Sequence, residues 1–184
     1  MASLICPRVS LPTRSRSIRV SRRSGFPIRH IFNHVHGWLT RFAGTIQYDS
    51  SALDKFSVDL VVQDGSITTG NDNRDRDLRD TTFFFVDSFP TATFRSTQAY
   101  KNEQGMFLDG KLTIRGVTKD ITVPLEILGV GGSGERVVAG FRSEFKINRK
   151  DFGIEWNHKL DTGGMLLGDE VTITIELEAR KAKQ

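Results

Sequence analysis

The chain has 184 residues, and what it lacks excludes several classes of protein. Its single cysteine, Cys6, excludes an internal disulfide framework and any site built from several thiolates. No apolar run approaches the roughly 20 residues that a membrane-spanning helix needs, so we expect no stable membrane insertion. The sequence contains no Gly-x-Ser-x-Gly elbow, phosphate-binding glycine loop or dinucleotide fingerprint. It nominates no nucleophile with its base, and we expect neither an enzyme nor a cofactor.

Acidic residues and lysine are absent from residues 1–48, which contain eight arginines. The other 18 basic residues stand against all 22 acidic ones, so the chain from position 49 onward carries a net charge of −4. The pI near 9.4 therefore reflects the N-terminal segment. A nucleic-acid-binding domain carries positive charge on its folded surface, so we expect no nucleic-acid partner. A leader that binds anionic membrane or nucleic acid is the alternative.

Residues 1–24 are rich in arginine and serine and show no sustained apolar periodicity. This composition predicts a disordered basic leader, followed by a folded domain over residues 25–180 and a short tail at 181–184. The leader lacks the apolar core of a secretory signal peptide, so a cytoplasmic location is the literal interpretation. The alternative is a periplasmic protein with a misassigned or damaged N-terminus.

From Gly25 onward the pattern is one of successive β-strands. Candidate strands are residues 26–28, 38–48, 56–63, a short one around Phe94, 106–114, 121–128, 141–147 and 171–179. Their alternation is typical of strands with one apolar face and indicates an antiparallel sandwich or barrel. Pro124 indicates a free edge or a bulge, and residues 129–134 a flexible hairpin connection. The one good helix candidate is Asp72–Arg79, with Asn71 placed to cap it.

Three separated segments carry a resemblance to a known family. They are Asn148–Asn157 with 160–164 and 167–170, Thr69–Arg79 with Phe83-Phe84 and Phe89-Pro90, and Gly110–Thr118. In this order they resemble the YceI family of lipocalin-like polyisoprenoid-binding proteins, over residues 25 to 179. The resemblance implies an all-β fold, an antiparallel eight-stranded lipocalin-like barrel with one short helix. It is also compatible with a homodimer.

Thirteen phenylalanines supply apolar surface without a polar atom to satisfy. They can simply fill the barrel, because an eight-stranded barrel is either packed with side chains or holds one small ligand. We expect Phe56, Phe94, Phe107, Phe141 and Phe145 to face the interior. The resemblance implies that the lumen holds a long-chain isoprenoid, quinone or acyl lipid, and that the protein is a non-enzymatic carrier.

The expected ligand-binding residues fall into an apolar and a polar group. The apolar group is Phe26, Phe84, Phe94, Leu112, Ile114, Phe141, Phe145 and Trp156, and the polar group at the mouth is His30, Asn71, Arg74, Arg79 and Asn157. The planar fork of arginine suits an anionic head group. Two structural alternatives stay open: residues 74–77 as a solvated helix face, and residues 148–157 as a corner in which Gly153 permits an unusual backbone angle.

Metal and enzyme hypotheses have less support. His34 and His36 lack a further nearby ligand for zinc, and the series Asp72, Asp75, Asp77 and Asp80 lacks the glycine and terminal glutamate of a calcium loop. We therefore expect no metal site. The second functional hypothesis is a hydrolase or isomerase acting on such a lipid, with His30 and either Asp75 or Asp151.

Overall fold

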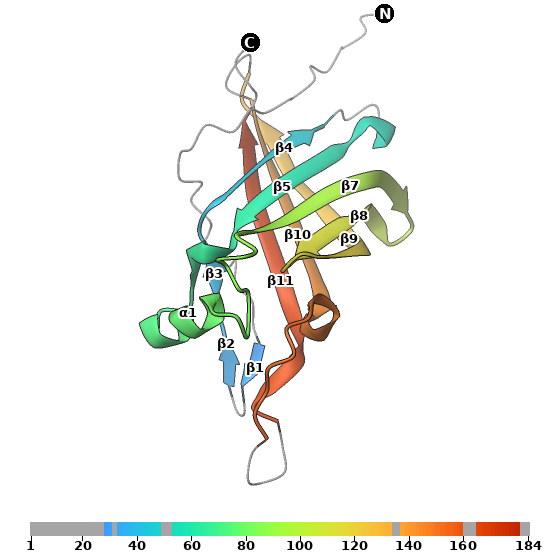
Figure 1. Cartoon of the computed structure of the whole chain (residues 1–184). Helices are drawn as coiled ribbons and strands as arrows, with labels where there is room; N and C mark the ends of the chain where they lie inside the picture. The colour runs from blue at the N-terminus through green and yellow to red at the C-terminus, as the bar shows by residue number, and fades with distance from the viewer. Residues whose placement is uncertain (1–27, 31–32, 49–52, 134–136, 160–164, 181–184) are drawn as a thin grey trace, which may run out of the picture.

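The computed structural model describes residues 28–30, 33–48, 53–133, 137–159 and 165–180 (Figure 1). The strands are β1 Ile28–His30, β2 Asn33–Val35, β3 Trp38–Leu39, β4 Phe42–Gln47, β5 Ser57–Gln63, β6 Ile67–Thr68, β7 Thr91–Asn102, β8 Gly105–Ile114, β9 Val117–Gly131, β10 Val138–Asn148 and β11 Leu167–Arg180. The helices are α1 Asp72–Arg79 and the 3-10 turns η1 Leu53–Lys55, η2 Asp64–Ser66 and η4 Arg149–Phe152. Within the described ranges, no helix is long and apolar enough to cross a membrane.

Nine strands form one sheet in the order β2-β1-β11-β10-β9-β8-β7-β5-β4, and β3 pairs separately with β6. All of the strand pairs are antiparallel. Figure 1 shows the sheet curling around its concave face, with α1 at one end. The expected all-β lipocalin-like fold with one short helix is confirmed. The expected barrel had eight strands; in the described residues nine strands form the sheet, and its end strands β2 and β4 do not pair with each other, so the sheet is a half-barrel.

The expected strand at residues 38–48 divides into β3 and β4. The division occurs at Thr40 and Arg41, whose amides both donate to the Ser66 hydroxyl at 3.1 and 3.0 Å. These amides therefore bond to a side chain instead of a neighbouring strand. The Ser66 hydroxyl in turn donates to the Gln63 carbonyl, which ties β3 and β4 to the η2 turn.

Other strand boundaries also differ from the prediction. β7 has 12 residues where we expected a short strand, and β9 begins at Val117, which confines the preceding turn to Arg115-Gly116. Residues 129–131, expected in a flexible connection, pair with Val138–Gly140 of β10. Backbone pairing needs no side chain, so glycine can extend this hairpin.

Helix α1 has the predicted bounds, and the Asn71 side chain accepts a hydrogen bond from the Arg74 amide at 3.1 Å. The cap satisfies one of the amides that a helix N-terminus leaves without a partner. The predicted helix and its cap are confirmed. The arrangement places α1 beside the short strand β6.

Strands β9 and β10 are not paired along their whole length. Their pairing ends at Arg142 and Glu126, and Pro124, two residues earlier in the chain than Glu126, has no amide hydrogen to donate. The Ser143 hydroxyl donates to the Pro124 carbonyl at 2.6 Å in this region. The η4 turn follows β10 and contacts β9. It buries Phe152 to 2% exposure in a cluster with Leu112 and Ile114.

Candidate functional site

The concave face of the sheet encloses a cavity of about 700 Å³. Strand alternation directs every second side chain into it. The inward rows that line it include Phe56, Val58, Leu60 and Val62 on or beside β5, Leu108, Leu112 and Ile114 on β8, Phe141, Phe145 and Ile147 on β10, and Ile173 and Leu177 on β11. The alternation expected of the candidate strand at residues 56–63 is confirmed. These rows make the wall mainly hydrocarbon.

Aromatic rings pack in one of the two core clusters that border the cavity. Tyr48, Phe56 and Phe141 meet edge to face, with ring centroids 5.9 to 6.0 Å apart. This geometry is favourable for aromatic pairs and adds to their apolar burial. The rings thus fill one part of the interior, and the cavity remains beside them. Side chains therefore fill one part of the interior, and another part is left as a cavity, so both of the outcomes considered for the barrel are present.

The side of the cavity near α1 carries polar side chains. Its lining there includes Thr69, Arg74, Asp77, Asp80 and Thr82. Trp156 lies against Phe83, with ring centroids 5.3 Å apart, and is 40% exposed. A large ring that both lines the cavity and meets solvent marks a rim. An amphiphilic molecule in the cavity would have its apolar part inside and its polar part at this rim, in contact with water.

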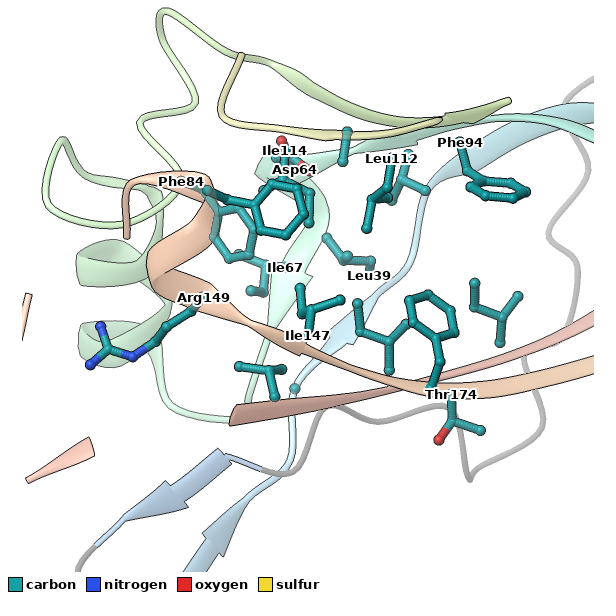
Figure 2. Close-up of a pocket in the computed structure, with 18 of the residues that line it drawn as sticks. Leu39, Asp64, Ile67, Phe84, Phe94, Leu112, Ile114, Ile147, Arg149 and Thr174 are labelled. Carbon is teal, nitrogen blue, oxygen red and sulfur yellow. The ribbon is translucent and has the colours of Figure 1, made fainter. Parts of the chain in front are cut away.

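The structure brings most of the predicted apolar residues together. Those that line the cavity are Phe84, Phe94, Leu112, Ile114, Phe141, Phe145 and Trp156. Figure 2 shows Phe84, Phe94, Leu112 and Ile114 around the pocket. Their contact with a ligand stays a prediction. Phe26 lies outside the described residues.

Phe107 was expected to face the interior, and that expectation is wrong. Its neighbour Leu108 lines the cavity, so alternation turns Phe107 to the opposite face of β8. There it stacks on Tyr100, with ring centroids 5.7 Å apart and an interplanar angle of 21°. The Phe107 side chain is therefore part of a cross-strand pair outside the cavity.

The predicted polar residues are more scattered. Arg74 lines the cavity, and its guanidinium donates to the hydroxyl and carbonyl oxygens of Thr69 at 2.8 and 3.2 Å. Arg79 lies outside the lining and donates to the carbonyls of Gly65 and Ile67 at 3.1 and 2.7 Å. These bonds hold α1 against the η2 turn and β6. Asn71 also lies outside the lining, in its capping position.

Asn157 is likewise outside the lining. Its amide group donates to the Leu167 carbonyl at 2.8 Å and accepts from the Leu167 amide at 2.9 Å. This pair of bonds mimics strand pairing and ties the segment after Trp156 to the start of β11. For His30 the structure gives the backbone, in β1, and its side chain lies outside the description.

The α1 surface agrees in part with the solvated-face alternative. Arg76 and Asp77 are exposed, whereas Asp75 is buried and accepts hydrogen bonds from the Thr69 amide and hydroxyl at 2.7 and 2.5 Å. Burial raises the pKa of the Asp75 carboxyl, but hydrogen bonds from Thr69 and Thr68 and the charge of Arg79 outweigh it, so the pKa lies below its ordinary value. Asp75 therefore stabilises the turn that leads into α1.

Arg149 was not among the predicted site residues, although it lies in the segment 148–157. It is 3% exposed and donates to the carbonyls of Gly168, Ile154 and Trp156 at 2.9, 2.7 and 2.7 Å. Its Nη2 also pairs with Asp169 at 3.1 Å. Arginine suits this position because its fork offers five donors in a fixed plane. The guanidinium fixes the loop that carries Trp156.

The segment 148–157 has the contacts of a structural corner. Asn148 caps η4 by accepting from the Lys150 amide at 3.0 Å, and Gly153 ends it with φ of 71°. A hydrogen bond from Lys150 lowers the pKa of the Asp169 carboxyl, against a smaller opposing effect of burial, and the charges of Lys150 and Arg149 lower it further. Asp169 therefore stays ionised and anchors both cations.

Asp64 is the second residue that the sequence interpretation missed. Its side chain is fully buried, it belongs to the cavity lining, and neither carboxyl oxygen has a hydrogen-bond partner among the described residues. Burial raises the pKa of this carboxyl to about 7, against a smaller lowering effect of the Ala92 backbone amide, which lies near the carboxyl but does not meet the geometry of a hydrogen bond to it. A signal was present in the sequence: Asp64 continues the two-residue alternation of positions 56, 58, 60 and 62.

The acids named for the enzymatic alternative do not reach this cavity. Neither Asp75 nor Asp151 belongs to the lining, and Asp151 is exposed. In the part of the chain that the structure describes, no group of three or more His, Cys, Asp or Glu side chains could hold a metal ion. The candidate site is therefore an apolar cavity with a polar rim.

Comparison with known proteins gives consistent matches. The model of the YceI-like domain matches residues 16–179. Protein YceI of Salmonella arizonae is 35% identical over 133 residues, which cover 70% of this chain and 69% of that protein. The YCEI protein of Campylobacter jejuni is similar in structure, with a TM-score of 0.72 and 27% identity, covering 93% of this chain and all of that one.

Two more distant structures share the fold. BcnA of Burkholderia cenocepacia superposes with a TM-score of 0.71 at 23% identity, covering 84% of this chain and 94% of that one. A polyisoprenoid-binding domain from Saccharophagus degradans, implicated in plant cell wall breakdown, gives a TM-score of 0.63 at 18% identity, covering 85% of this chain and 92% of that one. At these identities the likeness shows the fold alone.

Proposed function

The chain belongs to the YceI-like family, and on this premise we propose that it is a non-enzymatic protein that binds and carries one amphiphilic isoprenoid or quinone-type lipid. The observation that supports this proposal is the cavity of about 700 Å³ lined by inward rows of apolar side chains. The apolar chain of the lipid lies along these rows. Its polar end lies toward the rim near Trp156 and α1.

The size of the cavity agrees with a lipid chain of moderate length. At roughly 30 Å³ per group, the volume of one water molecule in the liquid, about 700 Å³ accommodates roughly twenty carbon atoms, or four isoprene units. Burial contributes about 0.8 kcal/mol per methylene, so such a chain gains about 16 kcal/mol before the costs of binding. Those costs are about 4 to 15 kcal/mol. Apolar burial alone is thus large enough to drive binding.

The comparisons support the choice of ligand class. The Saccharophagus degradans domain is named for binding a polyisoprenoid, and its fold matches this one. The apolar wall is suited to the repeating methyl-branched units of such a chain. Turnover is not part of the proposal, because Asp75 and Asp151 lie outside the lining.

A pair of adjacent substitutions on β8 tests the proposal. Leu112 is buried and points into the cavity, whereas Lys111 is exposed on the opposite face. Leu112→Trp should fill part of the cavity and weaken uptake of a four-unit polyprenyl lipid, while Lys111→Trp adds the same ring outside and should leave uptake unchanged. Native mass spectrometry after incubation with geranylgeraniol measures the bound fraction. Repeated recovery of empty wild-type protein, with no uptake of the added lipid, would refute the proposal.

A further inference from the structure

The polar atoms that border the cavity differ in whether they already have partners. The guanidinium groups of Arg74 and Arg149 donate to Thr69 and to four groups around residues 154–169, respectively. Ser143 donates to the Pro124 carbonyl. Asp64 is different: both of its carboxyl oxygens are buried without a hydrogen-bond partner among the described residues. Buried polar atoms are nearly always hydrogen-bonded, so this group requires an explanation.

The position of Asp64 directs attention to the cavity. It follows β5 directly and continues the inward row that Val58, Leu60 and Val62 form. Figure 2 places Asp64 in the pocket wall with Phe84 and Ile114. The backbone of its turn is well satisfied, since its amide donates to the Pro90 carbonyl at 3.0 Å and its carbonyl accepts from Ile67. The turn therefore needs nothing from the carboxyl group itself.

The surroundings of Asp64 hold few charges. β3 consists of Trp38 and Leu39, and β7 begins with Thr91 and Ala92, so neither element presents a titratable side chain to η2. From α1, the Arg79 guanidinium reaches the Gly65 and Ile67 carbonyls and does not bond to the Asp64 carboxyl. Burial raises the pKa of Asp64 to about 7. Below that pH the group is a neutral acid with one O–H to donate.

We propose that Asp64 is a ligand-binding residue whose carboxyl group donates a hydrogen bond to an uncharged oxygen, a carbonyl or hydroxyl, on the bound lipid. This inference rests on the proposed function and names the chemistry of the preferred lipid. The carboxyl is 0% exposed, so contact requires rotation of an adjacent lining side chain. Such rotations are ordinary in a cavity that has room beside its walls.

The proposal predicts discrimination by head group. Above about pH 7, where Asp64 ionises, an anionic diphosphate beside it would meet like charge, and the Arg149 guanidinium already donates to three carbonyls and to Asp169. A pure hydrocarbon ligand leaves the Asp64 O–H without an acceptor, and an unsatisfied buried donor is unfavourable in free energy. A ligand with a carbonyl or hydroxyl oxygen supplies that acceptor. A hydrogen bond of ordinary strength corresponds to about threefold to tenfold in affinity. With Asp64 protonated, a quinone or an alcohol should therefore bind more tightly than a hydrocarbon, and a diphosphate should lose affinity as Asp64 ionises.

The test compares four probes of similar chain type: menaquinone-4, geranylgeraniol, squalene and geranylgeranyl diphosphate. Dissociation constants are measured for wild type, Asp64→Leu, Asp64→Asn and the control Asp109→Asn at pH 6 and pH 8.5. Asp109 lies outside the cavity lining and accepts from Thr122. In wild type at pH 6, the quinone and the alcohol should bind about threefold to tenfold more tightly than squalene. Asp64→Leu should remove that preference while squalene still binds.

The pH dependence separates hydrogen bonding from packing. Raising the pH to 8.5 should weaken quinone binding by wild type and by Asp109→Asn, but not by Asp64→Asn, whose amide donates without titrating. Equal affinities for all uncharged probes in wild type, or a head-group preference that survives in Asp64→Leu, would overturn the inference and leave the carrier proposal standing. Failure of wild type to bind any probe would overturn both.

Discussion

Replacing Asp64 with asparagine should change how the stability of the empty protein depends on pH. The pKa of the Asp64 carboxyl rises from 3.8 to about 7 on folding because the group is buried. In the unfolded chain the carboxyl loses its proton near pH 4, whereas the folded protein retains it to about pH 7. The folded state therefore binds more protons in this window, and its stability falls as pH rises from about 4 to about 7.

The magnitude follows from the pKa difference. Each pKa unit corresponds to 1.36 kcal/mol, so the two units between pH 5 and pH 7 correspond to about 3 kcal/mol. Wild type should lose this amount between pH 5 and pH 8, and Asp64→Asn should not. The stability difference between the variant and wild type should thus shift by about 3 kcal/mol in favour of the variant across that range. All other groups titrate alike in the two proteins and cancel.

Urea unfolding at pH 5, 6, 7 and 8, followed by circular dichroism, measures this difference. Asp109→Asn is the control, because that carboxylate lies outside the cavity and accepts from the Thr122 hydroxyl. Its stability relative to wild type should stay nearly constant over the same range. If Asp64→Asn and wild type keep a constant difference from pH 5 to pH 8, Asp64 does not titrate as a buried acid, and the argument from its burial is wrong.

Three further predictions concern residues that position the site. Arg149→Met should destabilise the protein by about 3 to 5 kcal/mol in urea unfolding, because it leaves three carbonyls without their donor and Asp169 with Lys150 as its remaining partner; a loss below about 1 kcal/mol would contradict the assigned contacts. Gly110→Ala should cost about 1 to 3 kcal/mol, since a Cβ there would lie 2.7 Å from the Phe94 ring and 2.6 Å from the Arg95 carbonyl oxygen; unchanged thermal stability would show that the strands can separate. Asp75→Asn should destabilise the protein by about 1.5 to 3 kcal/mol at pH 7 and by progressively less as the pH falls below 4. The reason is that a carboxyl with a lowered pKa stabilises the folded state only when it is ionised. A destabilisation that does not change with pH would show that the Asp75 carboxylate does not stabilise the fold in this way.

Local patterns in the sequence were sufficient where a single element decides its own structure. The bounds of α1 follow from the Asn71 cap and the polar run behind it, and the inward row at positions 56–62 follows from alternation. Phe107 shows the limit of that reasoning. Its aromatic character favoured the interior, but the phase of β8 is set by Leu108, Leu112 and Ile114, and those residues take the inward face. The phase of a strand is therefore a better guide than the hydrophobicity of one residue.

Polar side chains were harder to place, because their role depends on neighbours that are distant in sequence. Arg79 and Asn157 looked suited to a head group, yet each bonds to backbone groups at least ten residues away. Arg149 joins segments 20 residues apart, and nothing in its local pattern indicates four bonds. Long-range partners of this kind become visible only when the chain is folded.

Asp64 combines the two cases, and for that reason it carries the most information about function. Its position in the inward row could be read from the alternation that begins at Phe56, whereas its missing partner could not. If this position served only to make the cavity lining apolar, a hydrocarbon side chain would be expected here, because burying an acid without a hydrogen-bond partner is costly. The same argument does not apply to Arg149, whose donors are satisfied within the chain. The cost at Asp64 is therefore best explained by an oxygen that the bound molecule brings.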